Sequence, residues 1–135
     1  MTEPFLGAKL AIFVGDRIVT ILRDDIPTIP WPGHWDLPGG AREPGETPEA
    51  CVLRELWEEL GLRLSEADLI HKAQGRRKGR NVWFFAAEQP DFRDADVVFG
   101  DEGQEWRLAP VDWFLAHEKA VAHQKDSIRS YLELR

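Results

Sequence analysis

The sequence of 135 residues predicts a single α/β domain, spanning 1–135, in which a mixed β-sheet lies between helices. Apolar, β-branched runs mark several short strands, and two amphipathic segments interrupt or follow them with helical spacing. Helices that interrupt a mixed set of strands are typical of an α/β sandwich and not of a parallel doubly wound sheet. At this length one core can bury about two-thirds of the unfolded surface.

The N-terminal part predicts a hairpin followed by a long loop. Strands are expected at 9–14 and 17–23, because Gly15-Asp16 between them is a turn signal. Residues 24–34 contain three prolines and predict an extended loop. A short strand at 35–37 then leads into a Pro38-Gly39-Gly40 turn.

The C-terminal part predicts a second strand pair and two helices. Strands are expected at 69–74 and 81–88, joined by a basic turn at 75–80. An acidic loop at 91–103, a strand at 106–108 and a short helix opening at 110–114 follow. Apolar residues at helical spacing then predict an amphipathic helix from about 118 to 134.

The strongest helix signal covers about 47–61. Thr47, Pro48 and Glu49 supply a hydroxyl N-cap, a proline at the first helical position and an early acid, and Gly61 is suited to end the helix. One face is expected to be buried; its members are Ala50, Leu53, Leu56, Trp57 and Leu60.

The other face of this helix carries a carboxylate stripe. Glu55, Glu58 and Glu59 stand at i, i+3 and i+4, and their charges repel unless a cation lies among them. Oxygen ligands favour Mg²⁺, with Mn²⁺ as the second candidate, and predict metal-assisted hydrolysis of a phosphate ester or anhydride. Arg54 can pair with Glu58, four residues on, or with Glu46.

Composition narrows the partners. The net charge of −7, from 17 basic and 24 acidic residues, disfavours a general binder of duplex DNA but does not exclude anionic substrates, since a metal neutralises the acids of its site. No apolar run is long enough to span a bilayer, and no signal peptide is evident. The single cysteine, Cys51, suits a cytoplasmic protein and is expected to be a packed helix residue.

The run from Gly40 to Leu62 resembles the Nudix box, G-x5-E-x7-R-E-U-x-E-E-x-G-U with U aliphatic, at every fixed position. Residues 35–40 and 101–106 are similar to segments of MutT-like members. The resemblance implies the Nudix α/β/α sandwich and a metal held by Glu55 and Glu59, with Glu58 on a second ion or reached through water. It adds a backbone carbonyl at Gly39 or Gly40.

The resemblance also implies supporting roles in catalysis. Glu46 and Arg54 are expected to orient the ligands. The general base is either Glu55 or a loop carboxylate, for which Glu102 is the first candidate, also as a metal ligand, and Glu105 the reserve.

Substrate recognition is less sharply predicted. The expected substrate-binding residues are Arg23, Trp35, Gly39, Gly40 and Phe85, the last from the run Trp83-Phe84-Phe85. The cluster Arg76, Arg77, Lys78 and Arg80 is either a grip for a polyphosphate tail or a solvated hairpin tip. MutT-like members read a purine with an asparagine at the start of the last helix. Here His117, His123 and Gln124 stand nearby, which weakens the case for an oxidised guanine.

The resulting prediction is Mg²⁺-dependent hydrolysis of a nucleoside diphosphate linked to another group X. Nucleoside triphosphates, ordinary or damaged, are the first candidates. ADP-ribose, nucleotide sugars and dinucleoside polyphosphates stay open, as do a non-catalytic nucleotide-binding regulator and an enzyme acting on RNA 5′ ends. The chain is expected to be a monomer or a homodimer.

Overall fold

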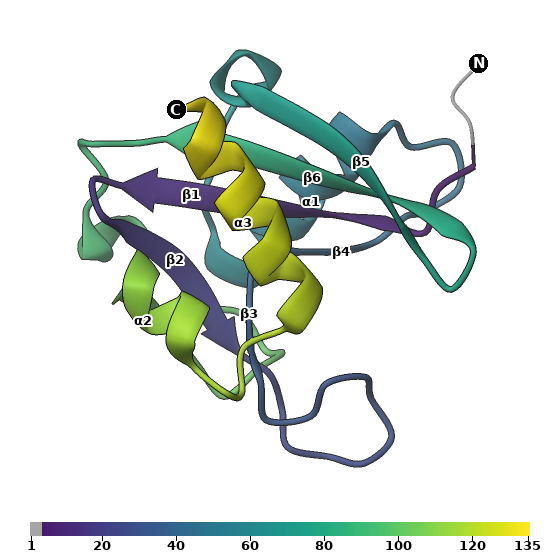
Figure 1. Cartoon of the computed structure of the whole chain (residues 1–135), viewed down its shortest axis with the longest axis horizontal. Helices are drawn as coiled ribbons and strands as arrows, with labels where there is room; N and C mark the ends of the chain where they lie inside the picture. Colours follow the sequence, from purple (N-terminus) through teal and green to yellow (C-terminus); the bar gives the residue numbers. More distant parts are fainter. Residues whose placement is uncertain (1–3) are drawn as a thin grey trace.

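A computed structural model describes residues 4–135 and confirms the α/β class, with a seven-stranded mixed sheet between helices (Figure 1). The strands are β1 (Gly7–Val14), β2 (Arg17–Leu22), β3 (Trp35–Asp36), β4 (Gly39–Ala41), β5 (His71–Arg77), β6 (Arg80–Glu88) and β7 (Glu105–Pro110). The helices are α1 (Pro48–Leu60), α2 (Val111–Ala116) and α3 (Ala122–Leu134), with short 3₁₀ turns at Glu66–Asp68 and Asp94–Asp96.

The strand order is β3-β2-β1-β6-β5, with β7 paired to β2 and β4 paired to the beginning of β1. Only the β1–β6 pair is parallel among these ladders. The sequence predicted a turn at Gly39-Gly40, whereas the structure shows these residues in the short strand β4, opposite Lys9 and Ala8. Gly39 has φ of 131°, a conformation that a side chain would strain. This strand carries the backbone that meets α1.

Apolar side chains fill both faces of the sheet. The core on the α1 side includes Leu10, Ile12, Val52, Leu56 and Phe85. The core on the opposite side includes Phe13, Leu37, Phe114, Ile128 and Tyr131, from the sheet, α2 and α3. Figure 1 shows α3 crossing in front of the sheet and α1 behind it. Within residues 4–135 we find no helix with the length and apolarity needed to cross a membrane.

The buried face of α1 is rotated from the predicted one. The buried residues are Pro48, Cys51, Val52, Leu56 and Leu60. Ala50 is exposed, and Trp57 is 47% exposed beneath the guanidinium of Arg63, which lies 3.9 Å from the ring centroid. Because the buried stripe runs through Cys51, Leu56 and Leu60, Glu55 and Glu59 lie at its margin and not on a fully solvated face.

Several other element boundaries also differ from the expectation, most clearly in the second hairpin and the last helix. The basic turn at 75–80 contracts to Lys78 and Gly79, whose φ values of 51° and 77° are those of a tight two-residue hairpin turn. The flanking residues extend β5 and β6. The last helix begins at Ala122, because residues 117–121 form a turn and a bridge to Trp35.

Candidate active site

The carboxylates of α1 reach the cavity because the helix is fixed at both ends. The Thr47 hydroxyl accepts a hydrogen bond from the Ala50 N–H at 3.1 Å, and Gly61 ends the helix in the left-handed conformation. Between these ends, Glu59 accepts a hydrogen bond at 2.8 Å from the backbone N–H of Gly39. A β-carbon on Gly40 would lie 2.7 Å from the carboxyl carbon of Glu55, so only glycine permits this approach.

Arg54 holds the carboxylates behind this contact. Its guanidinium grips Glu46 through two hydrogen bonds, at 2.7 and 3.0 Å, and the carbonyl of Ala41 at 3.0 Å. It also donates to Glu55 and Glu58, each at 3.1 Å. Both pairings expected of Arg54 therefore occur together. Its hydrogen bonds are the main cause that lowers the pKa of Glu46.

Burial perturbs the pKa of Glu59 strongly. It raises the pKa of Glu59 to about 8, against the opposing influence of Lys9 and the Gly39 N–H. Burial also raises the pKa of Glu55, despite the hydrogen bond and charge of Arg54. Both acids are partly buried at one strand-helix contact, where desolvation disfavours their charged forms. A bound divalent cation would favour the charged forms again.

The three helix carboxylates do not converge as the sequence predicted. Across residues 4–135, no group of three or more His, Cys, Asp or Glu side chains is arranged to hold a metal ion. Glu58 turns outward, with its side chain 53% exposed, and pairs with Arg54. Glu55 and Glu59 instead each approach the backbone of Gly39-Gly40. Carboxylate and backbone carbonyl oxygens are the ligand types that fit Mg²⁺ or Mn²⁺.

A cavity of about 610 Å³ opens beside this contact. Such a volume suits a nucleotide-sized ligand. Its acidic lining residues are Asp36, Glu55, Glu59 and Glu102, and aromatic, basic, polar and small residues form the rest. Other lining residues include Gly39, Gly40, Arg23, Lys9, Trp31, Trp83, Phe84, Arg77 and His123.

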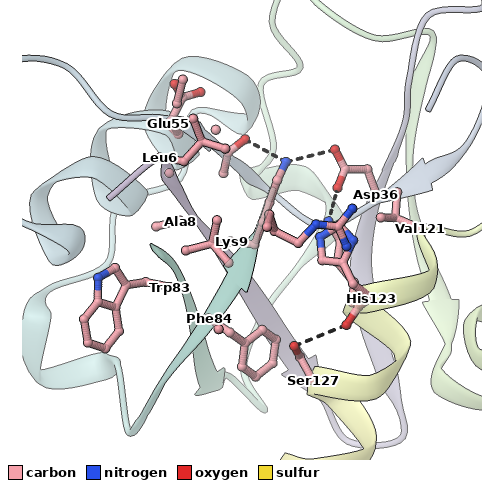
Figure 2. A pocket seen from close by; sticks show the side chains of 18 of the residues that line it. Leu6, Ala8, Lys9, Asp36, Glu55, Trp83, Phe84, Val121, His123 and Ser127 are labelled. Atoms are coloured by element: carbon pink, nitrogen blue, oxygen red, sulfur yellow. Dashed lines mark hydrogen bonds and ion pairs between the residues drawn. The ribbon is translucent and has the colours of Figure 1, made fainter. Parts of the chain in front are cut away.

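A buried aspartate organises the cations of the cavity. Asp36 is 5% exposed, and its Oδ2 accepts from Lys9 and from Arg23, both at 2.9 Å, while Oδ1 accepts from the Gln124 amide at 2.5 Å. Burial alone would raise the pKa of Asp36, but Lys9, Gln124 and Arg23 hold it below its ordinary value. Lys9 also donates to the Gly39 carbonyl at 3.0 Å (Figure 2). The network thus ties the cations to the strand that contacts Glu59.

The sequence did not single out Lys9 or Asp36. Each is a charge inside an otherwise apolar strand, and that pattern is the signal that was available. Gln124, noted only as a departure from asparagine, has both ends of its amide engaged, by Asp36 and by the Leu37 N–H at 3.0 Å.

Two expected substrate contacts need correction. Trp35 is buried in the core, packed edge-on against Trp113 with ring centroids 5.2 Å apart, and it does not line the cavity. Phe85 is 1% exposed in the core beneath α1. Since side chains alternate along a strand, Phe84 points to the opposite face and lines the cavity instead. Trp31, from the proline-rich loop, is a further aromatic residue that the sequence did not single out.

The loop carboxylates separate clearly. Glu102 lines the cavity, whereas Glu105 starts β7, pairs with Arg107 at 3.4 Å and lies outside the cavity lining. The loop of Glu102 is anchored to the end of α1, where the Gly100 N–H donates to the Glu59 carbonyl at 2.8 Å.

Cys51 is a packed residue, as expected. It is fully buried, and burial raises the pKa of its thiol to about 11, so the thiol stays protonated at neutral pH.

This fold and this carboxylate helix define the class of the protein. The model of the NUDIX domain matches residues 6–131, and the chain therefore belongs to the Nudix family. Together with relatives named as pyrophosphohydrolases, this membership supports a hydrolase that acts on acid anhydrides.

Individual relatives carry several names. The chain is 37% identical over 98 residues to an "8-oxo-dGTP diphosphatase" of Escherichia coli, covering 67% of this chain and 73% of that protein. It is 42% identical over 130 residues to an "RNA pyrophosphohydrolase" of Roseobacter denitrificans, covering 81% and 77%. A "MutT-like protein" of Streptomyces ambofaciens is 54% identical over 47 residues, but the match spans only 35% of this chain and 30% of that protein.

Solved structures share the fold. A MutT protein from Methanosarcina mazei superposes with a TM-score of 0.74 at 22% identity, covering 98% of this chain and 96% of that one.

Proposed function

We propose that this protein hydrolyses a nucleoside diphosphate linked to another group X, with Mg²⁺ as cofactor and water as the attacking nucleophile. Nucleoside triphosphates, including damaged ones, are the first substrate class. The observation that carries the proposal is the partly buried contact of Glu55 and Glu59 with the Gly39-Gly40 strand, at the wall of a nucleotide-sized cavity.

The residues of this contact have distinct proposed roles. Glu55, Glu59 and the Gly40 carbonyl would hold the metal, which neutralises phosphate charge and lowers the pKa of bound water. Glu58, on the outer side, would join through water or a second ion. Arg54 orients Glu55 and Glu58 and, with Glu46, fixes their helix to the strand of Gly40.

Two carboxylates compete for the role of general base. Glu102 faces the cavity from a loop, where it could also join the metal, and Glu55 lies beside the expected metal. Both have a lone pair free to orient a water once phosphate is bound. Arg23, held by Asp36 on the cavity wall, is placed to meet a phosphate or a base.

The alternative functions are hydrolysis of a substrate with a different group X, or nucleotide binding without hydrolysis. ADP-ribose, nucleotide sugars and dinucleoside polyphosphates present the same diphosphate to the carboxylates. The relative named for RNA pyrophosphate chemistry adds an RNA 5′ end to this set. A non-catalytic regulator is the least supported reading, because the chain keeps every acid of the motif.

A panel assay tests the proposal. Release of phosphate, pyrophosphate and monophosphate is measured for these substrates with Mg²⁺, with Mn²⁺ and with EDTA. Turnover that needs the metal and falls at least a hundredfold in Glu59→Gln supports it. Undiminished turnover in EDTA, or none on any member of the panel, contradicts it. Comparing Glu55→Gln with Glu102→Gln separates the base from the ligand, since loss of a ligand weakens Mg²⁺ binding while loss of the base alone lowers kcat.

A further inference from the structure

The tip of the β5–β6 hairpin concentrates positive charge that the fold does not use. The side chains of Arg77, Lys78 and Arg80 make no hydrogen bond or ion pair with any residue from 4 to 135. Their neighbour Arg76 differs: it donates to Asn81 at 2.9 Å and to the Gly79 carbonyl. In a chain with 24 acidic residues and a net charge of −7, this lack of partners is not due to a shortage of acids.

The turn itself keeps these charges close together. Lys78 and Gly79 form the two-residue turn, and Arg77 lies directly opposite Arg80 in the ladder. Like charges directly opposite each other in a hairpin are unfavourable. An anion bound between or beside them removes that repulsion.

Part of this cluster belongs to the cavity. Arg77 and Lys78 both line it, and Arg77 is only partly exposed. Residues 73, 75 and 77 share one face of β5, so the guanidinium of Arg77 lies on the face of the sheet that α3 covers. Arg76 points to the other face and does not line the cavity.

His123, on α3, lines the same cavity as Arg77, and Figure 2 shows His123 at the cavity wall. Its Nδ1 is buried and has no hydrogen-bond partner among the described residues. Burial, followed by the charge of Arg77, lowers the pKa of His123 to about 4. The imidazole is therefore neutral at pH 7 and offers one N–H donor and one acceptor.

A shallow floor joins this basic end to the carboxylates. Gly7, Val82 and Gly75 stand side by side on β1, β6 and β5, and all three line the cavity. A β-carbon on Gly75 would meet only Val82, at 3.6 Å, so the floor is open above this glycine. A nucleotide whose 5′ phosphates meet Glu55 and Glu59 would place its sugar and base over this floor.

We propose that Arg77, Lys78 and His123 form a second anion subsite, which takes a phosphate on the ribose of the nucleotide whose 5′ anhydride meets the carboxylates. The planar guanidinium of Arg77 suits two-point recognition of a phosphate, and an imidazole N–H can donate to a third oxygen. Lys78 adds a mobile charge at the rim. The inference rests on the proposed function only for the position of the 5′ phosphates.

One chemistry, a phosphate at the ribose 2′ or 3′ position, has two sources. It is a terminal phosphate on a small nucleotide, or it is the first internucleotide phosphate of an RNA 5′ end. Both leave the reaction at the carboxylates unchanged and differ only in what lies beyond the subsite.

Calorimetric titration with product-like nucleotides tests the subsite without turnover. The probes are AMP, adenosine 2′,5′-bisphosphate, adenosine 3′,5′-bisphosphate and the dinucleotide pApA, in Mg²⁺, with the guanosine series in parallel so that a base preference does not mask the result. One bisphosphate is expected to bind about tenfold to a hundredfold more tightly than the monophosphate, the range of charge-assisted hydrogen bonds. An equal gain with pApA identifies the RNA source, and a gain confined to the bisphosphate identifies the terminal phosphate.

The variants locate the effect. In Arg77→Gln and His123→Phe the bisphosphate and the monophosphate should bind with affinities within about twofold of each other. Arg76→Gln, which loses the same charge on the same hairpin, should keep the preference for the bisphosphate. Lys78→Gln, at an exposed turn position, serves as a second test in case either cavity variant folds poorly. Equal binding of mono- and bisphosphates by the unmodified protein, or a gain that survives Arg77→Gln, overturns the subsite.

The two proposals fail separately. Metal-dependent hydrolysis without any ribose-phosphate preference removes the subsite alone. A preference that depends on Arg77, in a protein that hydrolyses nothing in the panel, removes the proposed function alone.

Discussion

Replacing Glu59 with glutamine should stabilise the metal-stripped protein at alkaline pH while it abolishes turnover. Burial raises the pKa of this carboxyl from 4.5 to about 8. The folded protein therefore binds a proton that the unfolded chain has released between these two values. Stability from this group is complete below pH 4.5 and is lost as the pH rises through 8. Glutamine cannot ionise, so the variant escapes that loss.

The size of the effect follows from the shift. Each unit of pKa corresponds to about 1.36 kcal/mol, so a rise from 4.5 to about 8 sets a ceiling of roughly 4 to 5 kcal/mol above pH 8. Water that enters around the charged carboxylate lowers this, and about 1 to 2 kcal/mol is the working expectation. For a chain of this length that corresponds to a rise in Tm of roughly 3 to 8 °C. The glutamine oxygen can still accept from the Gly39 N–H, so the packing changes little.

Thermal unfolding in EDTA at pH 4.0 and 8.5 measures this directly. The variant should match the unmodified protein at the lower pH and exceed it at the higher. Glu118→Gln, at an exposed surface position, is the matched control and should show no such divergence. Saturating Mg²⁺ should restore stability at pH 8.5 to the unmodified protein and not to the variant. If the variant is no more stable than its parent at pH 8.5 in EDTA, burial does not raise the pKa of Glu59 and the reasoning is wrong.

Three further substitutions probe the same contact. Gly40→Ala places a methyl group against the Glu55 carboxyl and should weaken Mg²⁺ binding about tenfold to a hundredfold by calorimetry, with the fold retained in circular dichroism. Arg54→Gln removes the hydrogen bonds from Arg54 to its carboxylate partners, chiefly Glu46, and should lower the free energy of unfolding in urea by about 1 to 3 kcal/mol. An unchanged unfolding midpoint would show that these hydrogen bonds are absent in solution. Asp36→Asn leaves Lys9 and Arg23 without their shared anion and should lower the free energy of unfolding by about 3 kcal/mol. Urea unfolding curves that coincide with those of the parent would contradict this.

The sequence was most informative where local rules act. The helix with Thr47 and Gly61 at its ends was predicted to within a residue, because a hydroxyl cap, an N1 proline and a terminal glycine act on neighbouring backbone. The same holds for the first hairpin, whose turn at Gly15-Asp16 joins two adjacent strands. The α/β class followed from the order of these elements.

Which face of a helix or strand is buried was harder to predict than where the helix or strand lies in the sequence. The sequence predicts that Trp57 is on the buried side of α1, but the buried face of the helix runs through Cys51, Val52 and Leu56 and leaves Trp57 exposed. In the run Trp83-Phe84-Phe85, two faces alternate, and the sequence does not say which face becomes core. The prediction chose the wrong face of the strand: Phe85 lies in the core beneath α1, and its neighbour Phe84 lines the cavity.

Contacts between distant segments were not predictable from any one of them. Lys9, Asp36 and Gln124 are 27 and 88 positions apart along the chain, yet they share hydrogen bonds. The pairing of β1 with β4, the pairing of β2 with β3 and the packing of α3 bring them together. A charge inside an apolar strand predicts that some partner exists, but not which one.

The division of charge within the cavity ties these findings together. Glu55 and Glu59 stand where α1 meets β4, the anchored cations share Asp36, and the unanchored cations stand on the β5–β6 hairpin. Cations held by Asp36 are already neutralised in part, so they can shape the cavity more readily than they can attract a ligand. Arg77 and Lys78 have no acidic partner within residues 4–135, and they stand on the β5–β6 hairpin and not at the contact between α1 and β4. A ligand with phosphates at both ends satisfies both halves of this arrangement, whereas a ligand with one phosphate group satisfies only the acidic half, through its metal.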